Sequence, residues 1–222
     1  MFDHVQLDRE VPKLQQVNEN GTRYYVTPEG NKYPSITTVL SSYSIKHIME
    51  WRKRVGEDEA NKITRVASSR GTRIHKLCED YLDNKTPDFK THLDIETFRS
   101  LKPELHRINN IYAQELRMYS DHLRIAGTVD CVGQFDGRLS VIDFKTARRP
   151  KDKDQIANYF MQASAYAIMF EERFGIPVSQ TVIMIAVDEH EPQVFVEKRD
   201  KYVKQLLEFR DLYEKKSGLA IA

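Results

Sequence analysis

The chain has 222 residues, 40% of them hydrophobic, which is enough for one large domain, or a domain with an accessory lobe, around a sizeable core. Its 34 basic and 33 acidic residues nearly cancel, so the chain is not a polycation that coats nucleic acid through net charge alone. The two cysteines, Cys78 and Cys131, are too few to ligate an iron–sulfur cluster and form no CxxC zinc pair. We therefore expect no iron–sulfur cluster and two buried free thiols.

The chain begins without the basic and then apolar pattern of a secretion signal. It also contains no apolar run near the ~20 residues that span a bilayer. These features predict a protein that does not enter a membrane and lies in the cytoplasm of the cell that makes it. If a phage encodes the chain, this is the host cell cytoplasm.

The N-terminal part is predicted to be an extension, a hairpin and helices. Residues 1–20 are expected to be loosely attached, and residues 28–31, Pro-Glu-Gly-Asn, indicate the turn of a short hairpin. Ser35 is the expected N-cap of a helix that begins at Ile36. Further helices are predicted over 46–83, with a break near Gly71, and over 92–109, with a kink or restart at Pro103.

The pattern changes to strands in the middle of the chain. Alternating or apolar runs predict strands over residues 112–120, 124–135, 139–145, 181–187 and 193–196. Asp136-Gly137 is a strong hairpin signal between the second and third of these. A largely apolar helix over 155–174, closed by Gly175, and an amphipathic helix over 198–216 complete the predicted elements.

This order of elements predicts an α/β fold in which a central mixed β-sheet is flanked by helices. Residues 1–67 would form an N-terminal extension, hairpin and helical region. Residues 68–222 would form the core that holds the sheet.

The segment Asp143-Phe144-Lys145 ends a predicted strand and places two charges on one face, because side chains two apart in a strand point the same way. Isolated charges at the end of an apolar strand are costly, so they need either each other, as an ion pair, or a charged ligand. The same spacing occurs in polar or helical contexts, where solvated charges are the simpler interpretation, at Asp83-Asn84-Lys85, Asp88-Phe89-Lys90 and Glu214-Lys215-Lys216.

Asp130 lies on the neighbouring strand of the predicted hairpin, so its carboxylate is expected beside that of Asp143. Two adjacent carboxylates repel each other unless a cation lies between them. Proteins hold Mg²⁺ with one or two carboxylates together with water and substrate oxygens. Lys145 would then polarise a water or stabilise charge that develops on a phosphate. These residues indicate phosphodiester hydrolysis, with Asp130, Asp143 and Lys145 as the catalytic residues.

Several short motifs, in this order and spacing, resemble the RecB-like exonuclease branch of the PD-(D/E)XK nuclease superfamily. They are Arg70-Gly71-Thr72-x-x-His75, Gly127-x-x-Asp130, Asp143-x-Lys145 and Gln162-x-x-x-Tyr166. Residues 33–40, Tyr-Pro-Ser-Ile-Thr-Thr-Val-Leu, also resemble a stretch near the start of phage-encoded and mitochondrial single-strand DNA exonucleases. The chain departs from RecB-like members that bind an iron–sulfur cluster through four cysteines.

The resemblance implies that the site holds one or two Mg²⁺ or Mn²⁺ ions. The implied ligands are His75, Asp130, Asp143 and the backbone carbonyl of Phe144. Glu115 is a further candidate ligand, although an exposed strand carboxylate explains it equally well.

Other polar residues are expected to contact DNA. They belong to the motif helix, the loop after the catalytic strand and a polar stripe on the long apolar helix: Arg70, Thr72, Thr146, Arg148, Arg149, Gln162 and Tyr166. Trp51 and Arg52 combine an aromatic ring with a basic group, as in sites that hold single strands. A solvated basic loop and core packing of Trp51 are the alternatives.

The leading prediction is a metal-dependent exonuclease that acts on DNA, single-stranded or with free ends, in replication, recombination or repair. A structure-specific or restriction-like endonuclease on the same fold is the first alternative. A non-catalytic nucleic-acid-binding module is the second, and the presence of Asp130, Asp143 and Lys145 disfavours it.

Overall fold

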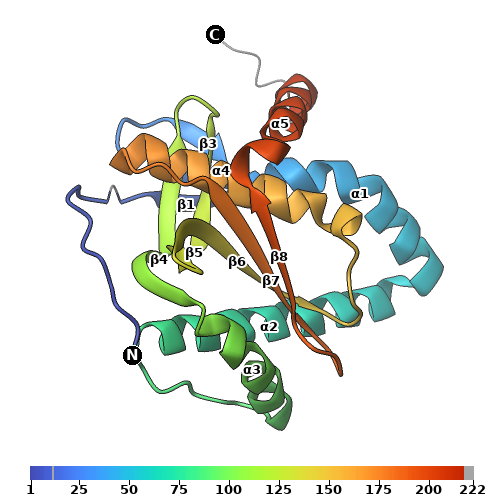
Figure 1. Cartoon of the computed structure of the whole chain (residues 1–222). Coiled ribbons are helices and arrows are strands. Elements are labelled where there is room, and N and C mark those ends of the chain that lie inside the picture. The colour runs from blue at the N-terminus through green and yellow to red at the C-terminus, as the bar shows by residue number, and fades with distance from the viewer. Residues whose placement is uncertain (12, 218–222) are drawn as a thin grey trace.

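The computed structural model of the chain describes residues 1–11 and 13–217, without the side chain of Tyr43. Residue 12, in the predicted extension, and residues 218–222, in the predicted core range, lie outside this description. The described residues form a three-stranded sheet near the N-terminus and a five-stranded sheet with helices on both of its faces (Figure 1). The predicted α/β class is confirmed.

The N-terminal sheet consists of β1 (Gln15–Glu19), β2 (Thr22–Val26) and β3 (Lys32–Pro34), paired antiparallel in that order. The expectation that residues 1–20 are loosely attached is wrong. Besides forming β1, this segment is held against the core, where the Val5 N–H donates to the Ile111 carbonyl at 2.8 Å. The sequence hides β1 because its side chains are almost all exposed and therefore show no alternation.

Three helices follow: α1 (Ile36–Val55), α2 (Glu57–Leu82) and α3 (His92–Leu105). Ser35 caps α1 as expected, since its hydroxyl accepts the Thr38 N–H at 3.1 Å. The break expected near Gly71 is wrong, because the chain turns instead at Gly56, whose φ of +94° favours glycine. Helix α3 contains Pro103 but ends at Leu105, so the end of the predicted helix over 92–109 belongs to a strand.

The five-stranded sheet has the order β4-β5-β6-β7-β8. Its strands are β4 (Ile108–Ser120), β5 (Ile125–Phe135), β6 (Arg138–Ala147), β7 (Gln180–Val187) and β8 (Gln193–Lys198). Only the β6–β7 pair is parallel among these described strands, so the sheet is mixed, as predicted. The crossover between β6 and β7 is α4 (Ala157–Phe174), which Gly175 ends in a left-handed conformation, and the last described helix is α5 (Val203–Ser217).

Helix α4 crosses one face of the large sheet, while α2 and α3 cover the other (Figure 1). The alternation of β6 follows from this arrangement: Val141 packs in the core under α4, whereas Ile142 and Phe144 pack toward α2 and α3. Every residue of β7 is buried, as expected for a parallel strand covered on both faces. Cys78 and Cys131 are buried free thiols, as predicted. Within the described part of the chain, no helix is both long and apolar enough to cross a membrane.

Candidate active site

The candidate site lies where two strands of the large sheet separate. Pairing between β5 and β6 ends at Cys131 and Ile142, whereas β6 stays paired with β7 as far as Ala147. Asp130 and Asp143 are the next residues on the two separating strands. The Phe144 N–H donates to Asp130 Oδ2 at 2.8 Å. A side chain thus replaces the strand partner of this N–H, which fixes the Asp130 carboxylate at the opening.

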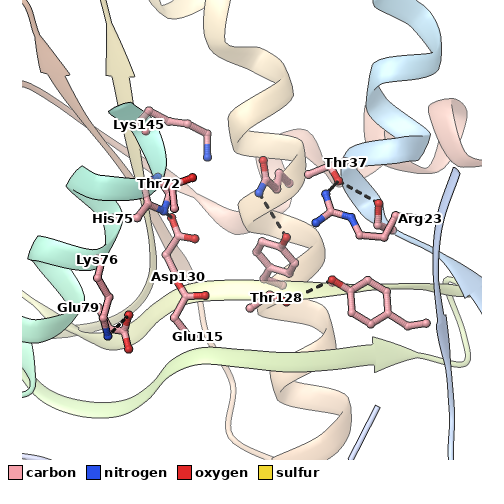
Figure 2. A pocket seen from close by; sticks show the side chains of 16 residues that line it. Arg23, Thr37, Thr72, His75, Lys76, Glu79, Glu115, Thr128, Asp130 and Lys145 are labelled. Atoms are coloured by element: carbon pink, nitrogen blue, oxygen red, sulfur yellow. Dashed lines mark hydrogen bonds and ion pairs between the residues drawn. The ribbon is translucent and has the colours of Figure 1, made fainter. Parts of the chain in front are cut away.

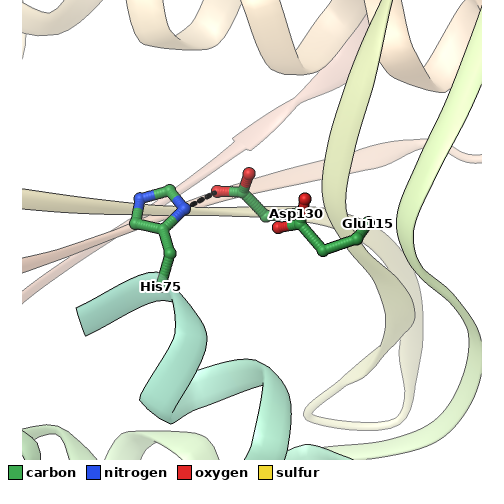
Figure 3. A group of neighbouring side chains, drawn as sticks. All are labelled: His75, Glu115 and Asp130. Carbon is green, nitrogen blue, oxygen red and sulfur yellow. Dashed lines mark ion pairs between the residues drawn. The ribbon is translucent and has the colours of Figure 1, made fainter. Parts of the chain in front are cut away.

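Helix α2 and strand β4 each add one ligand-type side chain beside Asp130. His75 Nδ1 lies 3.4 Å from Asp130 Oδ2, and the His75 ring packs edge-on against Phe144. Glu115 adopts φ +47° within β4, a left-handed conformation that costs a non-glycine residue about 1–2 kcal/mol. Ligand atoms of His75, Glu115 and Asp130 all lie within 4.8 Å of one another, and Figure 3 shows the three side chains converging.

The charges of this group influence one another strongly. Burial alone would lower the pKa of His75, but the hydrogen bond and charge of Asp130 outweigh it and raise that pKa. Burial would raise the pKa of Asp130, yet His75, Lys145 and the Phe144 N–H together lower it. Burial raises the pKa of Glu115, and the negative charge of Asp130 raises it further. The cluster therefore concentrates negative charge that a cation would relieve.

Asp143 lies beside this group but does not belong to the three-residue cluster. Its carboxylate is 1% exposed and forms an ion pair with Lys145, while its Oδ1 has no hydrogen-bond partner among the described residues. Burial raises the pKa of Asp143 to about 6, although the Lys145 ammonium opposes this. A buried carboxylate oxygen without a partner is costly. Together with the oxygen and nitrogen ligand atoms of the neighbouring three-residue cluster, this carboxylate oxygen fits a hard divalent cation such as Mg²⁺ or Mn²⁺.

Lys145 links this site to the α4 side of the sheet. Its ammonium lies 5.2 Å from the centre of the Tyr159 ring and pairs with Asp143. Burial would lower the pKa of Lys145, but the carboxylates of Asp143 and Asp130 outweigh this and raise it. The site therefore places the positively charged Lys145 ammonium among acidic side chains.

A cavity of about 530 Å³ opens in front of these groups (Figure 2). Of the residues predicted to contact DNA, Thr72, Gln162 and Tyr166 line it. The Gln162 amide donates to the Tyr166 hydroxyl at 3.3 Å. Gly127 makes room for this ring: a Cβ there would lie 2.7 Å from Tyr166 Cε1, so the glycine of the sequence motif allows Tyr166 to reach the cavity.

The other residues predicted to contact DNA do not line this cavity. Arg70 is buried and pairs with Asp188, and Arg52 pairs with Glu57 at 2.7 Å. These two guanidinium groups hold the protein's own elements together in this structure. The remaining four lie outside the cavity with different exposure: Thr146 and Trp51 are half-buried, while Arg148 and Arg149 are exposed.

The structure adds cavity residues that the sequence analysis did not assign to the site. Glu79 and Lys76 come from α2, while Arg23, Tyr25, Ser35 and Thr37 come from the N-terminal sheet and the start of α1. The hydroxyl-rich stretch from Ser35 to Thr38 was a signal for the latter, but it was interpreted as a helix cap and as part of the resemblance over residues 33–40, without a role for its side chains in the site. Nothing local in the sequence places Arg23 near Asp130.

A mixed sheet whose separating strands carry two aspartates and a lysine beneath a flanking helix defines the class of this protein. The chain belongs to the PD-(D/E)XK nuclease superfamily, whose sequence model matches residues 90–217, more than half of the chain. The matched segment includes Asp130, Asp143 and Lys145 and begins after His75.

Curated relatives carry the name mitochondrial genome maintenance exonuclease 1. The protein from Mus musculus is 27% identical over 211 residues, which cover 86% of this chain and 62% of the relative. The Homo sapiens protein is 27% identical over 177 residues, which cover 73% of this chain and 51% of the relative. This chain therefore spans only part of their length. A solved structure of a putative exonuclease from Eubacterium rectale aligns with 68% of this chain and 65% of its own, with 11% sequence identity and a TM-score of 0.47. This similarity is too low to carry a conclusion.

Proposed function

We propose that this nuclease is a metal-dependent DNA exonuclease that hydrolyses phosphodiester bonds from single-stranded ends. The observation that carries the proposal is the convergence of His75, Glu115 and Asp130 within 4.8 Å at a cavity that Lys145 also lines. The superfamily supplies the nuclease class, and the relatives are named as exonucleases. We further propose that the substrate is DNA undergoing replication, recombination or repair.

His75, Asp130 and Glu115 would hold the metal ion, which we propose to be Mg²⁺ or Mn²⁺. Asp143 and the backbone carbonyl of Phe144 would complete the ligands of one ion or join a second. When bound, such an ion activates water and polarises the phosphate. The left-handed backbone at Glu115 supports a functional role for this residue, because strained conformations cluster at sites where the geometry serves a function.

Lys145 would act on the reacting phosphate. Its ammonium is held between the Asp143 carboxylate and the Tyr159 ring, so it is oriented before substrate arrives. A preoriented cation stabilises the negative charge that develops during phosphodiester cleavage without reorganising at that moment. Asp143 would therefore have two tasks: it is a candidate ligand, and it positions Lys145.

Side chains around the cavity would position the strand. Gln162, Tyr166 and Thr72 line the cavity and offer hydrogen-bond donors to phosphate oxygens. Thr146 lies near the end of strand β6, and Arg148 and Arg149 come directly after that strand. These three residues would follow the backbone of the substrate. Arg70, being paired with Asp188, would act by holding α2 against the end of β7.

The preference for free ends rests on the helices that precede the site. Residues 1–67 would form an N-terminal region with an arch-like pair of helices, and residues 68–222 the nuclease core. Residues 57–69 of α2 are exposed apart from Ala60 and Ile63, as expected for a segment that projects from the core. Trp51 and Arg52 on α1 would take part in strand binding at this projection. A strand passed under such helices must enter from an end.

The cytoplasmic location expected from the sequence stays a proposal, because the relatives are named for mitochondrial genome maintenance. The partner we propose is DNA, single-stranded or with free ends.

The test compares a linear single strand with a covalently closed circle of the same sequence. With Mg²⁺ or Mn²⁺, we expect the linear strand to be shortened while the circle survives, and EDTA to stop the reaction. Asp130→Asn should abolish both cleavage and metal binding measured by calorimetry. Rapid cutting of the circle would replace the exonuclease proposal with an endonuclease. Cleavage that survives both EDTA and Asp130→Asn would refute the metal site.

A further inference from the structure

The wall of the cavity opposite the metal-ligand cluster is built from the N-terminal sheet and α1. Arg23 lies on β2, and Ser35 and Thr37 lie at the start of α1. Figure 2 shows Arg23 and Thr37 on one side of the cavity and His75, Glu115 and Asp130 on the other. The Tyr25 hydroxyl, which also lines the cavity, lies 3.2 Å from Thr128 Oγ1. The cavity therefore has an acidic side and a basic, hydroxyl-bearing side.

Arg23 differs from the other arginines that are at least half-buried in the described chain. Each of those forms an ion pair with a carboxylate: Arg52, Arg70, Arg73, Arg124, Arg173, Arg199 and Arg210. Arg23 has no carboxylate partner among the described residues. Its guanidinium instead donates to Thr37 Oγ1 at 2.9 Å, and Ser35 Oγ lies 2.9 Å from the same oxygen.

A half-buried guanidinium without a counter-charge is costly unless an anion binds it. The planar guanidinium of arginine can donate two hydrogen bonds to the oxygens of a phosphate, and serine and threonine hydroxyls commonly donate hydrogen bonds to phosphate oxygens as well. The hydrogen bond to Thr37 leaves other N–H groups of Arg23 free to bind a ligand. The cavity volume of about 530 Å³ falls within the ~300–1,000 Å³ that is typical of small-molecule and cofactor sites.

We propose that Arg23, with Thr37 and Ser35, binds a phosphate of the substrate strand that flanks the phosphate being cut. The inference rests on the proposed function, because the scissile phosphate is taken to lie at the His75–Glu115–Asp130 cluster. Arg23 is then a positioning residue that holds the strand in register. A substrate with only one phosphate cannot bind Arg23 in this way. The N-terminal hairpin, outside the family match over residues 90–217, would thereby form part of the substrate site.

The first experiment measures binding of a labelled single-stranded oligonucleotide by fluorescence anisotropy with Mg²⁺, in the Lys145→Ala background so that the strand survives. We expect Arg23→Gln to weaken binding about 10-fold, as when one hydrogen bond to a charged group is removed. The slope of log K against log salt should become smaller by about 0.7. Arg23→Lys should keep the salt slope but bind with lower affinity. Arg99→Gln, a change of an exposed arginine on α3, is the matched control and should behave like the parent.

The second experiment locates the phosphate. Neutral methylphosphonates are placed at successive positions of the strand, and each is tested against the parent and Arg23→Gln. At one position beside the cut, we expect the methylphosphonate to lower the affinity of the parent but not to lower the affinity of Arg23→Gln any further. This pattern is the signature of a direct contact between Arg23 and that phosphate. An unchanged profile in Arg23→Gln would overturn the proposal. The proposal would also be overturned if the affinity of Arg23→Gln no longer depended on which base stands at that position while its methylphosphonate profile stayed that of the parent. Arg23 would then bind the base.

Activity separates this inference from the proposed function. In the otherwise wild-type enzyme, Arg23→Gln should lower kcat/KM for the oligonucleotide about 10-fold more than for bis(4-nitrophenyl) phosphate, which has a single phosphate. Equal losses on both substrates would place Arg23 at the reacting phosphate and overturn the flanking assignment. If the wild type cuts neither substrate but the methylphosphonate profile depends on Arg23, hydrolysis fails as the function while the phosphate site stands.

Discussion

The two halves of helix α2 lie in different surroundings. The half from Arg70 to Leu82 packs against β6 and α3, with Ile74, Cys78 and Leu82 fully buried, and it carries His75 to the acidic cluster. In residues 57–69, by contrast, only Ala60 is buried. One helix thus joins a part that is packed into the core and carries His75 to a part that the core leaves almost entirely exposed.

This difference suggests a division of tasks along the chain. Groups that must be placed accurately stand on elements buried on both sides, because packing locks their rotamers. The exposed half of α2 and the neighbouring end of α1 have no such support, so they suit the binding of a substrate whose position varies. Substitutions in the two regions should therefore differ both in kind and in size.

The largest effect is expected at Lys145, on the buried side of the comparison. Lys145→Ala should lower the single-turnover rate of strand cleavage by about 10²–10³-fold, as when one stabiliser of transition-state charge is removed. Metal affinity, measured by calorimetry, should change far less, because Lys145 is not one of the proposed metal ligands. Lys145→Arg is the control, since it keeps a positive charge beside Asp143 and should retain more activity. Turnover of Lys145→Ala near that of the wild type would contradict the assignment.

Much of the fold followed from local signals. The Asp136-Gly137 turn and the Gly175 stop depend on left-handed backbone conformations that few residues adopt, whereas the Ser35 cap depends on its side-chain hydroxyl. All three are found. The sequence could not show that α2 continues through Gly71. Burial of Arg70 just before it, and of Ile74, Leu77 and Cys78 in the turns after it, outweighs the roughly 1 kcal/mol that glycine costs a helix.

The site was predictable only in part, for a similar reason. Asp143 and Lys145 share a strand, and Asp130 belongs to the same hairpin, so their proximity follows from alternation and a turn. Contacts between distant elements leave no such pattern. The pairing of Arg70 with Asp188 and the approach of Arg23 to the cavity depend on how β7 and β2 pack in the folded chain.

An intermediate effect is expected at Gly127, which packs against the Tyr166 ring at the cavity. A Cβ there would lie 2.7 Å from Tyr166 Cε1 and 3.2 Å from Ile36 Cγ2. Gly127→Ala should therefore lower the free energy of unfolding by about 1–3 kcal/mol and shift Tyr166 away from the cavity. Urea denaturation measures the first effect. Gly127→Ala as stable as the wild type would show that the ring moves at no cost.

Gly71→Ala is the matched control for this close approach. Its Cβ would lie 3.8 Å from Thr146 Oγ1, an ordinary van der Waals distance, in the middle of α2. Alanine favours the helix over glycine by up to ~1 kcal/mol, so the same substitution should be neutral or stabilising here. If the free energy of unfolding falls in Gly127→Ala but rises in Gly71→Ala, the close approach of Tyr166, and not the removal of a glycine in itself, determines the loss of stability at Gly127.

The smallest effect is expected in the exposed part of the comparison, at the junction of α1 and α2. Arg54 lies next to this junction on α1, Arg65 lies in the exposed half of α2, and both are exposed. If this projection binds the strand, the double variant Arg54→Gln/Arg65→Gln should weaken single-strand binding only a few-fold near physiological salt. The slope of log K against log salt should become smaller by about 0.7 for each phosphate that the variant no longer neutralises. Stability should stay within about 0.5 kcal/mol of the wild type.

Arg138→Gln, at an exposed site on the Asp136-Gly137 hairpin, is the control for charge alone. This hairpin lies at the end of β6 opposite Lys145, so removing its charge should leave the salt slope unchanged. Equal slopes for the double variant and Arg138→Gln would mean that the projecting helices do not touch the strand. The exonuclease proposal would then lack the feature on which its requirement for a free end depends, while the Asp130, Asp143 and Lys145 centre would be unaffected. A smaller slope in the double variant alone would assign strand binding to the half of α2 that the core leaves exposed.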